Sequence, residues 1–367
     1  MKVQLVDPSA FTPPYDRALA AALARGGAEV ELLTSRFIYG PVPEAEGYRV
    51  RESFYRRAAD RGVDAPARRA FKAAEHLPDM LRLRRELDAD VVHYQWLTMP
   101  ALDQHLLSPR RPRLITAHYI LPPRPSRRQV AGARGLFGRM DAVVTHSEHG
   151  AARLRDEVGL DPARVRVIPH GAFDHFTRLP EEKPLPVELE GAEGPVILFF
   201  GLLRPYKGLD TLLRAFRELE GAELWIVGNP RMDLEPLRRL ATGAPGRVRF
   251  VDRFVEDAEI PAIFRRADLV VLPYRDAEQS GVLYTGLAFG KPMVLSAVGG
   301  FPEVAATAAA RLVPSEDPSA LAQALSELTA DPAARDSLAA AARAAAAGPY
   351  SWDAVAAQTL ALYRDLV

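Results

Sequence analysis

Two cations stand three residues apart in the segment FFGLLRPYKGLDTLL, in a turn expected to join a strand to a helix. Arg204 and Lys207 precede a helix that begins after Gly208. The unpaired backbone N–H groups and the dipole at a helix start favour an anion, and two cations would add charge-assisted hydrogen bonds. The pattern predicts a diphosphate site, although Arg and Lys in an ordinary surface turn would have no function.

A second loop of the same kind contains a carboxylate. In LPYRDAEQSGVLYTGLAFGKPMV a strand is expected to end at Tyr274, and Ser280 can cap a helix over residues 281–289. Glu278 lies just before this helix. Because a carboxylate can accept two hydrogen bonds from sugar hydroxyls, we expect Glu278 to bind a sugar. The alternative is a solvated loop carboxylate.

Histidines and an Asp pair offer other chemistry. His118 follows the expected strand RLITA, where it could act on a ligand or only satisfy a structural hydrogen bond. His146 and His149 could form a metal pair, but no third ligand is apparent. Asp88 and Asp90 imitate a metal-binding D-x-D pair, yet they precede their strand, which is the wrong end for chemistry. Because the chain also lacks Cys, we expect no metal and no cofactor.

Short β-branched runs alternate with helical patterns over nearly the whole chain. This order predicts parallel sheets with helices on both faces. The expected strands are 2–7, 28–35, 90–96, 113–119, 142–147 and 165–171 in a first set, and 195–201, 222–228, 248–254, 269–274, 292–298 and 310–316 in a second.

The two sets predict an α/β fold of two doubly wound Rossmann-like domains that face each other across a cleft. Ligands in such sheets bind beyond the carboxyl ends of the strands. The segment between the sets has no clear period and contains several Pro and acidic residues, which is typical of a linker. The expected parts are an N-terminal domain 1–172, a linker 173–194, a C-terminal domain 195–350, and a helix 351–367 that can pack back on the N-terminal domain.

Composition and charge narrow the function class. The 367 residues are 48% hydrophobic and 26% charged, as in ordinary globular proteins too large for one core. No run approaches the roughly 18 apolar residues of a membrane-spanning helix. The start MKVQLVD resembles a first strand rather than a signal peptide, so we expect a cytoplasmic protein.

A net charge of zero conceals an asymmetry between the two halves. Up to residue 175 there are 27 Lys and Arg against 21 Asp and Glu, and 20 against 26 thereafter. We expect no nucleic-acid partner. A solvated helix face explains the basic excess, as would peripheral contact with an anionic membrane or a phosphorylated acceptor. The excess gathers at Arg56, Arg57, Arg61, Arg68, Arg69 and Lys72, interleaved with Phe54, Tyr55 and Phe71, and again at Arg124, Arg127 and Arg128.

At these motifs the chain resembles glycosyltransferase family 4 (group 1), whose members have the GT-B fold and retain anomeric configuration. The combination is more specific than any single motif, and the resemblance covers essentially the whole chain. The matching strings are GLLRPYKG at 201–208, EQSG at 278–281, GKPMV at 290–294 and GGFPE at 299–303, with weaker matches VIPHG at 167–171 and ITAHY at 115–119.

The resemblance implies roles for individual residues. Arg204 and Lys207 would hold the donor diphosphate, Glu278 would contact the donor sugar, and His118 would lie near the reacting sugar; these four are the expected catalytic residues. The expected donor-binding residues of the C-terminal domain are Gly201, Arg204, Lys207, Glu278, Gln279, Ser280, Gly281 and Val282. The expected acceptor-binding residues of the N-terminal domain are Asp16, His118 and Tyr119.

Two features depart from the family pattern. Where a second Glu would hold the ribose, this chain has Tyr284, Thr285 and Gly286. The glycine-rich loop after the first strand is replaced by PSAFTPPYD, from which Asp16 either faces the cleft or caps the following helix.

The resemblance therefore predicts a metal-independent, retaining glycosyltransferase. It would move a hexosyl unit from a UDP- or GDP-sugar to a glycan, lipid-linked or small-molecule acceptor in polysaccharide or glycolipid biosynthesis. The leaving phosphate would help to deprotonate the acceptor hydroxyl in a front-face reaction. Two alternatives share the fold: a nucleotide-sugar epimerase, and a catalytically silent nucleotide-sugar binder suggested by the missing second Glu.

Overall fold

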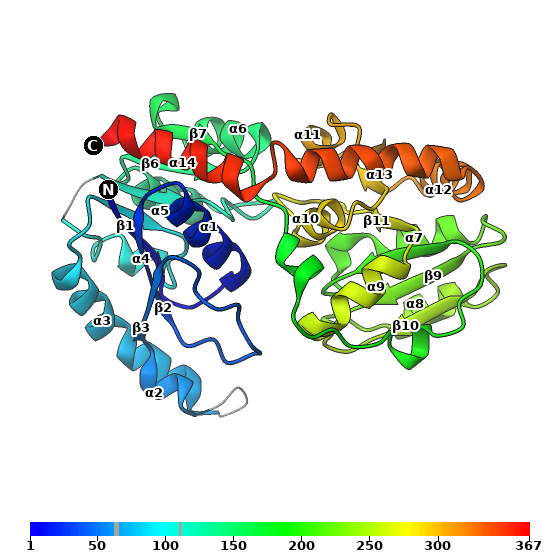
Figure 1. The fold of residues 1–367 in the computed structure, drawn as a ribbon, viewed down its shortest axis with the longest axis horizontal. Coiled ribbons are helices and arrows are strands. Elements are labelled where there is room, and N and C mark those ends of the chain that lie inside the picture. The colour runs from blue at the N-terminus through cyan, green and yellow to red at the C-terminus, as the bar shows by residue number, and fades with distance from the viewer. Residues whose placement is uncertain (62–65, 110–111) are drawn as a thin grey trace. The chain divides into compact units, whose positions relative to one another are not determined.

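The computed structural model describes residues 1–61, 66–109 and 112–367. They form two compact units, one of Met1–Gly171 with Tyr350–Val367 and the other of Ala172–Pro349. Each unit contains one sheet with helices around it (Figure 1). The predicted α/β class with two Rossmann-like domains is confirmed.

The first unit is built on a seven-stranded sheet in the order β3-β2-β1-β4-β5-β6-β7, with every neighbouring pair parallel. Its strands are β1 (Lys2–Asp7), β2 (Glu29–Ser35), β3 (Arg49–Phe54), β4 (Val91–Tyr94), β5 (Arg113–Thr116), β6 (Ala142–Thr145) and β7 (Val165–Val167). Its helices are α1 (Pro13–Arg25), α2 (Arg56–Ala59), α3 (Arg68–Glu86), α4 (Pro100–Asp103), α5 (Arg127–Phe137), α6 (Glu148–Asp156) and α14 (Trp352–Leu366).

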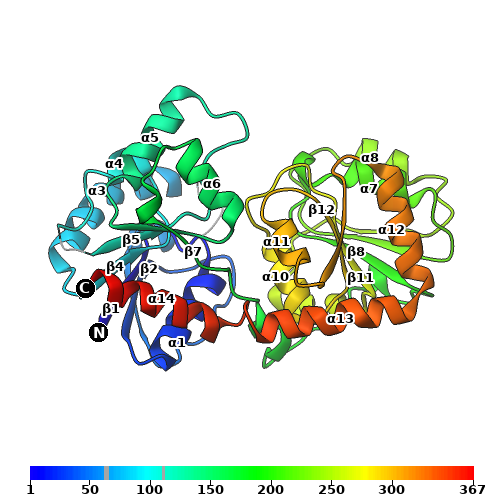
Figure 2. The same ribbon diagram turned by 90° about the horizontal axis from the view of Figure 1, so that it is seen from above.

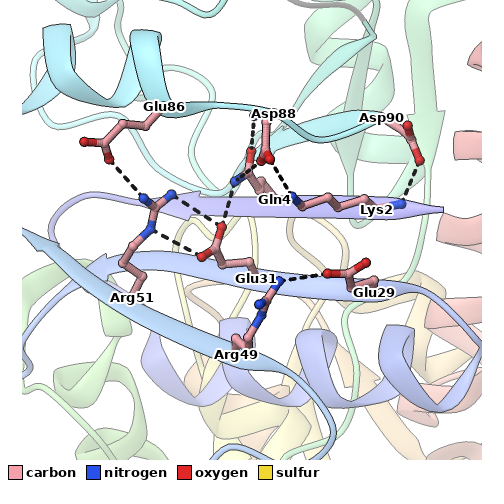
Figure 3. A network of polar contacts seen from close by, with 9 residues as sticks. All are labelled: Lys2, Gln4, Glu29, Glu31, Arg49, Arg51, Glu86, Asp88 and Asp90. Carbon is pink, nitrogen blue, oxygen red and sulfur yellow. Dashed lines mark hydrogen bonds and ion pairs between the residues drawn. The ribbon is translucent and has the colours of Figure 1, made fainter.

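Strand β3 was not expected from the sequence, because charged residues occupy both of its faces. It lies at the edge of the sheet, where such residues reach water. Arg49 forms an ion pair of 2.8 Å with Glu29, and Arg51 pairs with Glu31 and Glu86 (Figure 3). Cross-strand ion pairs therefore replace the apolar alternation by which a strand is normally predicted.

The aromatic residues of the basic stretch are less exposed than a membrane-binding face requires. Phe54 and Tyr55 are buried in the core of the first unit. Phe71 is half-buried, and the guanidinium of Arg61 lies 3.3 Å from its ring centroid. Phe54 and Tyr55 are therefore not available for membrane contact, although they are interleaved with the basic residues in the sequence.

The end of the chain belongs to the first unit. Figure 2 shows α14 alongside α1, and Arg25 of α1 forms an ion pair of 2.6 Å with Asp353 of α14. Trp352 packs against Gly171 so closely that a Cβ on this glycine would lie 2.4 Å from the indole ring.

The second unit contains a six-stranded parallel sheet in the order β10-β9-β8-β11-β12-β13. Each strand falls within a range expected from the sequence. The strands are β8 (Val196–Phe200), β9 (Glu223–Val227), β10 (Val248–Val251), β11 (Leu269–Leu272), β12 (Met293–Ser296) and β13 (Ala310–Val313). The helices are α7 (Leu209–Phe216), α8 (Glu235–Ala241), α9 (Ile260–Arg266), α10 (Gly281–Ala288), α11 (Phe301–Ala305), α12 (Pro318–Ala330) and α13 (Pro332–Ala347).

The segment expected to be a linker packs on the second unit. It includes the 3-10 helices Asp174–Arg178 and Val187–Leu189. The backbone N–H of Phe173 donates to the carbonyl of Tyr284 in α10, and Arg249 donates to carbonyls in the region after Val187–Leu189. Within the described ranges, no helix is long and apolar enough to cross a membrane.

Candidate active site

The strand order of the second unit places its two motif loops next to each other. The chain runs outward from β8 in one direction through β9 and β10, and from β11 in the other through β12 and β13. The point where the order reverses therefore lies between β8 and β11. Ligands of open α/β sheets bind at such a point, beyond the carboxyl ends of the strands. The loops after β8 and β11 contain the predicted diphosphate and sugar residues.

Three of the predicted donor residues meet at this point. Gly201, directly after β8, has a φ of +102°, which favours glycine. A Cβ on Gly201 would lie 3.1 Å from Nζ of Lys207 and 3.2 Å from Cγ2 of Val282 in α10. The absence of a side chain at Gly201 thus leaves room beside the ammonium group and the start of α10.

Lys207 is a buried cation. Its residue is 7% exposed, and Nζ lies 4.9 Å from the ring centroid of Tyr274. In the described part of the chain, no carboxylate forms an ion pair with this ammonium group. Because a buried charge without a counterion is costly, the site favours an anionic ligand. Arg204, three residues earlier, is exposed.

Arg275 holds the turn that contains Lys207, a role that the sequence motifs do not predict. Its guanidinium donates to the carbonyl of Pro205 at 2.9 Å and to both carboxylate oxygens of Asp210 at 2.8 and 2.7 Å. Its backbone N–H donates to the carbonyl of Tyr206 at 2.8 Å. The loop after β11 is thereby fastened to the turn after β8, so Arg275 acts as a positioning residue. The available signal in the sequence was an Arg shortly after a buried strand.

The loop after β11 ends at the expected helix start. Ser280 occupies the N-cap position of α10, but its side chain makes no capping hydrogen bond and instead lies 3.2 Å from the hydroxyl of Tyr274. The side chain of Ser280 therefore does not cap α10, although its carbonyl accepts from the backbone N–H of Leu283 at 3.0 Å. N–H groups at a helix start can bind an anionic ligand in sites of this type. Glu278 is half-buried just before the helix, and Gln279 accepts a hydrogen bond from Tyr284.

Met293 packs against the position of α10 at which a second carboxylate is absent. Gly286 stands where the family pattern has its second Glu. A Cβ at this position would lie 2.8 Å from Sδ of Met293 at the start of β12. A longer side chain at position 286 would therefore require the side chain of Met293 to move.

In the first unit, a chain of imidazoles leads to His118. Nδ1 of His146 lies 3.0 Å from the carbonyl of Ile168, which can only accept, so Nδ1 carries the proton. Nε2 of a neutral His146 is then an acceptor for Nδ1–H of His118, 3.2 Å away. This arrangement leaves Nε2 of His118 with its lone pair, and within the described residues that atom has no hydrogen-bond partner.

The surroundings of these histidines keep them neutral. The ring of His118 is stacked 5.0 Å from Trp96 and meets the edge of Tyr15 at 4.7 Å. Burial lowers the pKa of His146 to about 4, and burial and then the neighbouring His146 lower the pKa of His118 well below its ordinary value. His118 is therefore a hydrogen-bond acceptor or weak base at neutral pH, rather than a cation.

The other members of this group are structural. His93 bonds to the hydroxyl of Tyr363 at 2.6 Å and to that of Thr116 at 2.9 Å, so both ring nitrogens are satisfied. His170 bonds to the carbonyl of Gly171 at 2.7 Å.

Asp16 lies beneath the loop after β1, where it is 1% exposed, and does not cap α1. Its carboxyl group neighbours that of Asp7, and burial followed by the Asp7 charge raises the pKa of Asp16. Asp7 accepts from the backbone N–H groups of Ser9 and Phe11 at 3.1 and 2.6 Å. The pair therefore fixes the loop that replaces the glycine-rich turn. Tyr119, next to His118, is 54% exposed.

The D-x-D pair, Asp88 and Asp90, lies at the amino ends of the strands, whereas ligands of such sheets bind at the carboxyl ends. Asp88 forms an ion pair of 2.6 Å with Nζ of Lys2, and Asp90 accepts from the backbone N–H of Lys2 at 2.8 Å (Figure 3). Both precede β4, at the amino end of the strands. No cluster of three His, Asp or Glu able to hold a metal occurs among the residues that the structure describes.

Solved structures share this fold. Sucrose-phosphate synthase from Thermosynechococcus elongatus matches with a TM-score of 0.78 and 20% identity, over 100% of this chain and 98% of that one. Anabaena HepE in complex with UDP-glucose matches with a TM-score of 0.73 and 19% identity, over the whole of both chains. Two Rossmann-like units of this topology place the protein in the GT-B class.

Matches to family models identify the family, which the shared fold alone does not. Residues 17–172 match the model described as Glycosyltransferase Family 4, and residues 194–331 match that of Glycosyl transferases group 1. The chain therefore belongs to the family 4 (group 1) glycosyltransferases.

Relatives within this family carry related names. The D-inositol 3-phosphate glycosyltransferase of Kineococcus radiotolerans is 29% identical over 96% of this chain and 90% of that protein. The GDP-mannose-dependent monoacylated alpha-(1-6)-phosphatidylinositol monomannoside mannosyltransferase of Corynebacterium glutamicum is 30% identical over 60% of this chain and 61% of that protein.

Proposed function

We propose that this glycosyltransferase moves a hexosyl unit from a UDP- or GDP-sugar to an acceptor hydroxyl, with retention of anomeric configuration and without a metal. The observation that carries the proposal is the buried Lys207, which has no carboxylate partner in the described ranges and lies beside Gly201 and the start of α10. A diphosphate at this position would supply the missing counterion. The UDP-glucose bound to HepE and the GDP-mannose dependence of the Corynebacterium relative support a nucleotide sugar as donor.

The residues of the second unit would act on the leaving group. The bond between the anomeric carbon and the diphosphate oxygen breaks, and negative charge grows on that oxygen. Lys207, Arg204 and the N–H groups at the start of α10 stabilise this charge, which is the role that a metal ion has in other transferases. Arg275 holds the turn after β8 through its hydrogen bonds to Pro205 and Asp210. Lys207 would therefore already be in place before the donor binds.

The acceptor reacts from the face that the diphosphate leaves. Its oxygen forms the new bond to the anomeric carbon while its proton passes to the departing phosphate oxygen, so that no protein carboxylate is needed as a nucleophile. Glu278 would bind hydroxyls of the transferred sugar. Nε2 of His118 keeps its lone pair and is shielded from water. It would accept a hydrogen bond from a sugar hydroxyl close to the reacting carbon once a shift of the neighbouring rings exposes it.

The acceptor would be a glycan, a lipid-linked sugar or a small molecule, bound by the first unit through residues including His118 and Tyr119. The buried Asp16 would contribute by holding the loop after β1. We also propose a cytoplasmic protein that can touch an anionic membrane surface through exposed arginines. Since Phe54 and Tyr55 are buried, this contact would be electrostatic rather than insertive.

Product analysis tests the reaction. The protein should release UDP or GDP from one of a panel of UDP- and GDP-hexoses when candidate acceptors are present, and NMR of the product should show the anomeric configuration of the donor. An inverted product would contradict retention. Formation of an epimerised nucleotide sugar, or tight donor binding without transfer or hydrolysis for any acceptor, would refute the proposal in favour of an epimerase or a silent binder.

A further inference from the structure

A pocket opens at the carboxyl edge of β1, β2 and β3 in the first unit, apart from the predicted donor and acceptor residues. Residues that follow these three strands line it together with residues of α3: Ser9, Ser35, Arg36, Tyr55, Arg68 and Lys72. The pocket contains three cations, of which Arg36 is paired with Asp60 at 2.7 Å.

The other two cations of the pocket contact aromatic groups rather than carboxylates. Nζ of Lys72 lies 4.9 Å from the ring centroid of Tyr55 and 5.6 Å from that of Phe11. Arg68 donates to the hydroxyl of Tyr39 at 2.9 Å, and its Nε is shielded from water without a partner. Over the ranges 1–61, 66–109 and 112–367, no carboxylate forms an ion pair with Lys72 or Arg68. Burial and the charge of Arg68 lower the pKa of Lys72. An anion between the two would relieve this repulsion.

The floor of the pocket is held in a strained conformation. Tyr55 has a φ of +49°, which is rare for a bulky residue and is maintained only where the surroundings enforce it. Its backbone N–H donates to Asp79 at 2.8 Å, and its hydroxyl lies 2.6 Å from Nδ1 of His76. His76 in turn lies 2.6 Å from the buried carboxylate of Asp103. Tyr55 is thereby fixed beneath Lys72.

Hydroxyl groups extend this network to the pocket wall. The Tyr55 hydroxyl lies 3.1 Å from Oγ1 of Thr98, which lies 2.6 Å from Oγ of Ser9. Burial raises the pKa of Tyr55 to about 12, so the phenol keeps its proton and adds no negative charge. The pocket thus offers two ammonium or guanidinium groups and oriented hydroxyls, which is a set suited to a phosphate.

A continuous row of rings connects this pocket to His118. Phe11, which Lys72 contacts, lies 5.2 Å from Trp96, and Trp96 is stacked 5.0 Å from His118. Phe11 is 54% exposed, so its ring is open to a ligand. A molecule bound by an anionic group at Lys72 could lie along these rings and present a hydroxyl near His118.

We infer that this pocket binds a phosphate group of the acceptor, so that the acceptor is a phosphorylated polyol or sugar, either free or as a lipid headgroup. The description of this ligand as the acceptor rests on the proposed function; the existence of the phosphate site does not.

Calorimetry with inorganic phosphate tests the site. The full chain is titrated in the presence of saturating UDP or GDP, which occupies any diphosphate site of the second unit. We expect Lys72→Gln and Arg68→Gln each to weaken phosphate binding by about tenfold or more, as is typical for loss of a charged hydrogen bond. Lys72→Arg should retain most of the affinity. Arg84→Gln, an exposed position on the same helix, is the matched control and should leave phosphate binding unchanged.

The results of these titrations decide whether the phosphate site exists and which kind of phosphate it binds. A wild-type protein that does not bind phosphate, or equal losses in Lys72→Gln and Arg84→Gln at unchanged melting temperature, would overturn the inference. Glycerol phosphate that competes with inorganic phosphate supports a free acceptor, whereas binding to phosphatidylglycerol vesicles that is lost in Lys72→Gln supports a lipid headgroup. Binding of phosphate together with failure of the wild type to turn over any nucleotide sugar would leave this site standing and refute the proposed function alone.

Discussion

Acid should destabilise the first unit through its buried histidines. Burial lowers the pKa of His93 to about 3 and that of His146 to about 4, against an ordinary value of 6.5. At a pH between the lowered pKa of the folded state and the ordinary value of 6.5, the unfolded chain binds more protons than the folded one. The stability contributed by these groups is therefore present above pH 6.5. It is lost as the pH falls to about 4 for His146 and to about 3 for His93.

The size of the effect follows from the pKa values. One pKa unit corresponds to about 1.4 kcal/mol, so at pH 5 each of these two histidines should have lost about 2 kcal/mol of its contribution. The lowered pKa values of His118 and His170 act in the same direction. The raised pKa of the buried Asp16 acts in the opposite direction, because the folded state then binds the extra proton. The pH dependence of stability should therefore be compared between the wild type and a histidine variant, rather than taken from the wild type alone.

Urea unfolding at pH 7.5, 6.5, 5.5 and 5.0, followed by tryptophan fluorescence, measures this difference. His93→Gln should show a weaker fall of the unfolding free energy with acid, by up to about 1.4 kcal/mol per pH unit below 6.5. The exposed His105→Gln is the matched control and should follow the wild type. If His93→Gln and wild type lose stability in parallel between pH 6.5 and 5, the assignment of a neutral, proton-resisting cluster is wrong.

Three further predictions concern function. Transfer should survive EDTA, because cations of the second unit stabilise the leaving group, and a strict need for added manganese or magnesium would contradict this. Anionic vesicles should retain the protein at low salt and release it at high salt. Equal binding to neutral vesicles would contradict electrostatic contact with an anionic membrane. Glu278→Gln should leave the affinity for UDP or GDP nearly unchanged while lowering transfer roughly ten- to a hundredfold. Equal weakening of nucleotide binding would show that Glu278 does not serve the sugar.

Local patterns were sufficient to predict most of the fold. Every strand of the second sheet falls within an expected range, because continuous apolar runs between turn residues mark strands buried on both faces. The start of α10 after Ser280 was also correct to the residue. Strand β3 was missed, because the ion pairs of Arg49 and Arg51 depend on residues of β2, which are distant in the sequence.

Residues of the candidate sites were harder to predict where their environment depends on distant parts of the chain. The sequence indicates that Lys207 follows a strand, but not that it is buried or that Arg275 fixes its turn from 68 residues further on. The relation of His118 to His146 likewise arises from the pairing of β5 with β6. A motif thus predicts which residues take part, whereas protonation and burial follow from tertiary contacts.

The central claim is that Lys207 holds the diphosphate of a nucleotide sugar. Its most direct test is calorimetric titration of UDP and GDP into wild type, Lys207→Ala and Lys183→Ala, the last being an exposed lysine of the same unit paired with Glu256. We predict that wild type and Lys183→Ala bind one of the two nucleotides with equal affinity, and that Lys207→Ala binds it at least about tenfold more weakly. Equal affinity of Lys207→Ala and wild type, with both proteins folded, would contradict the claim.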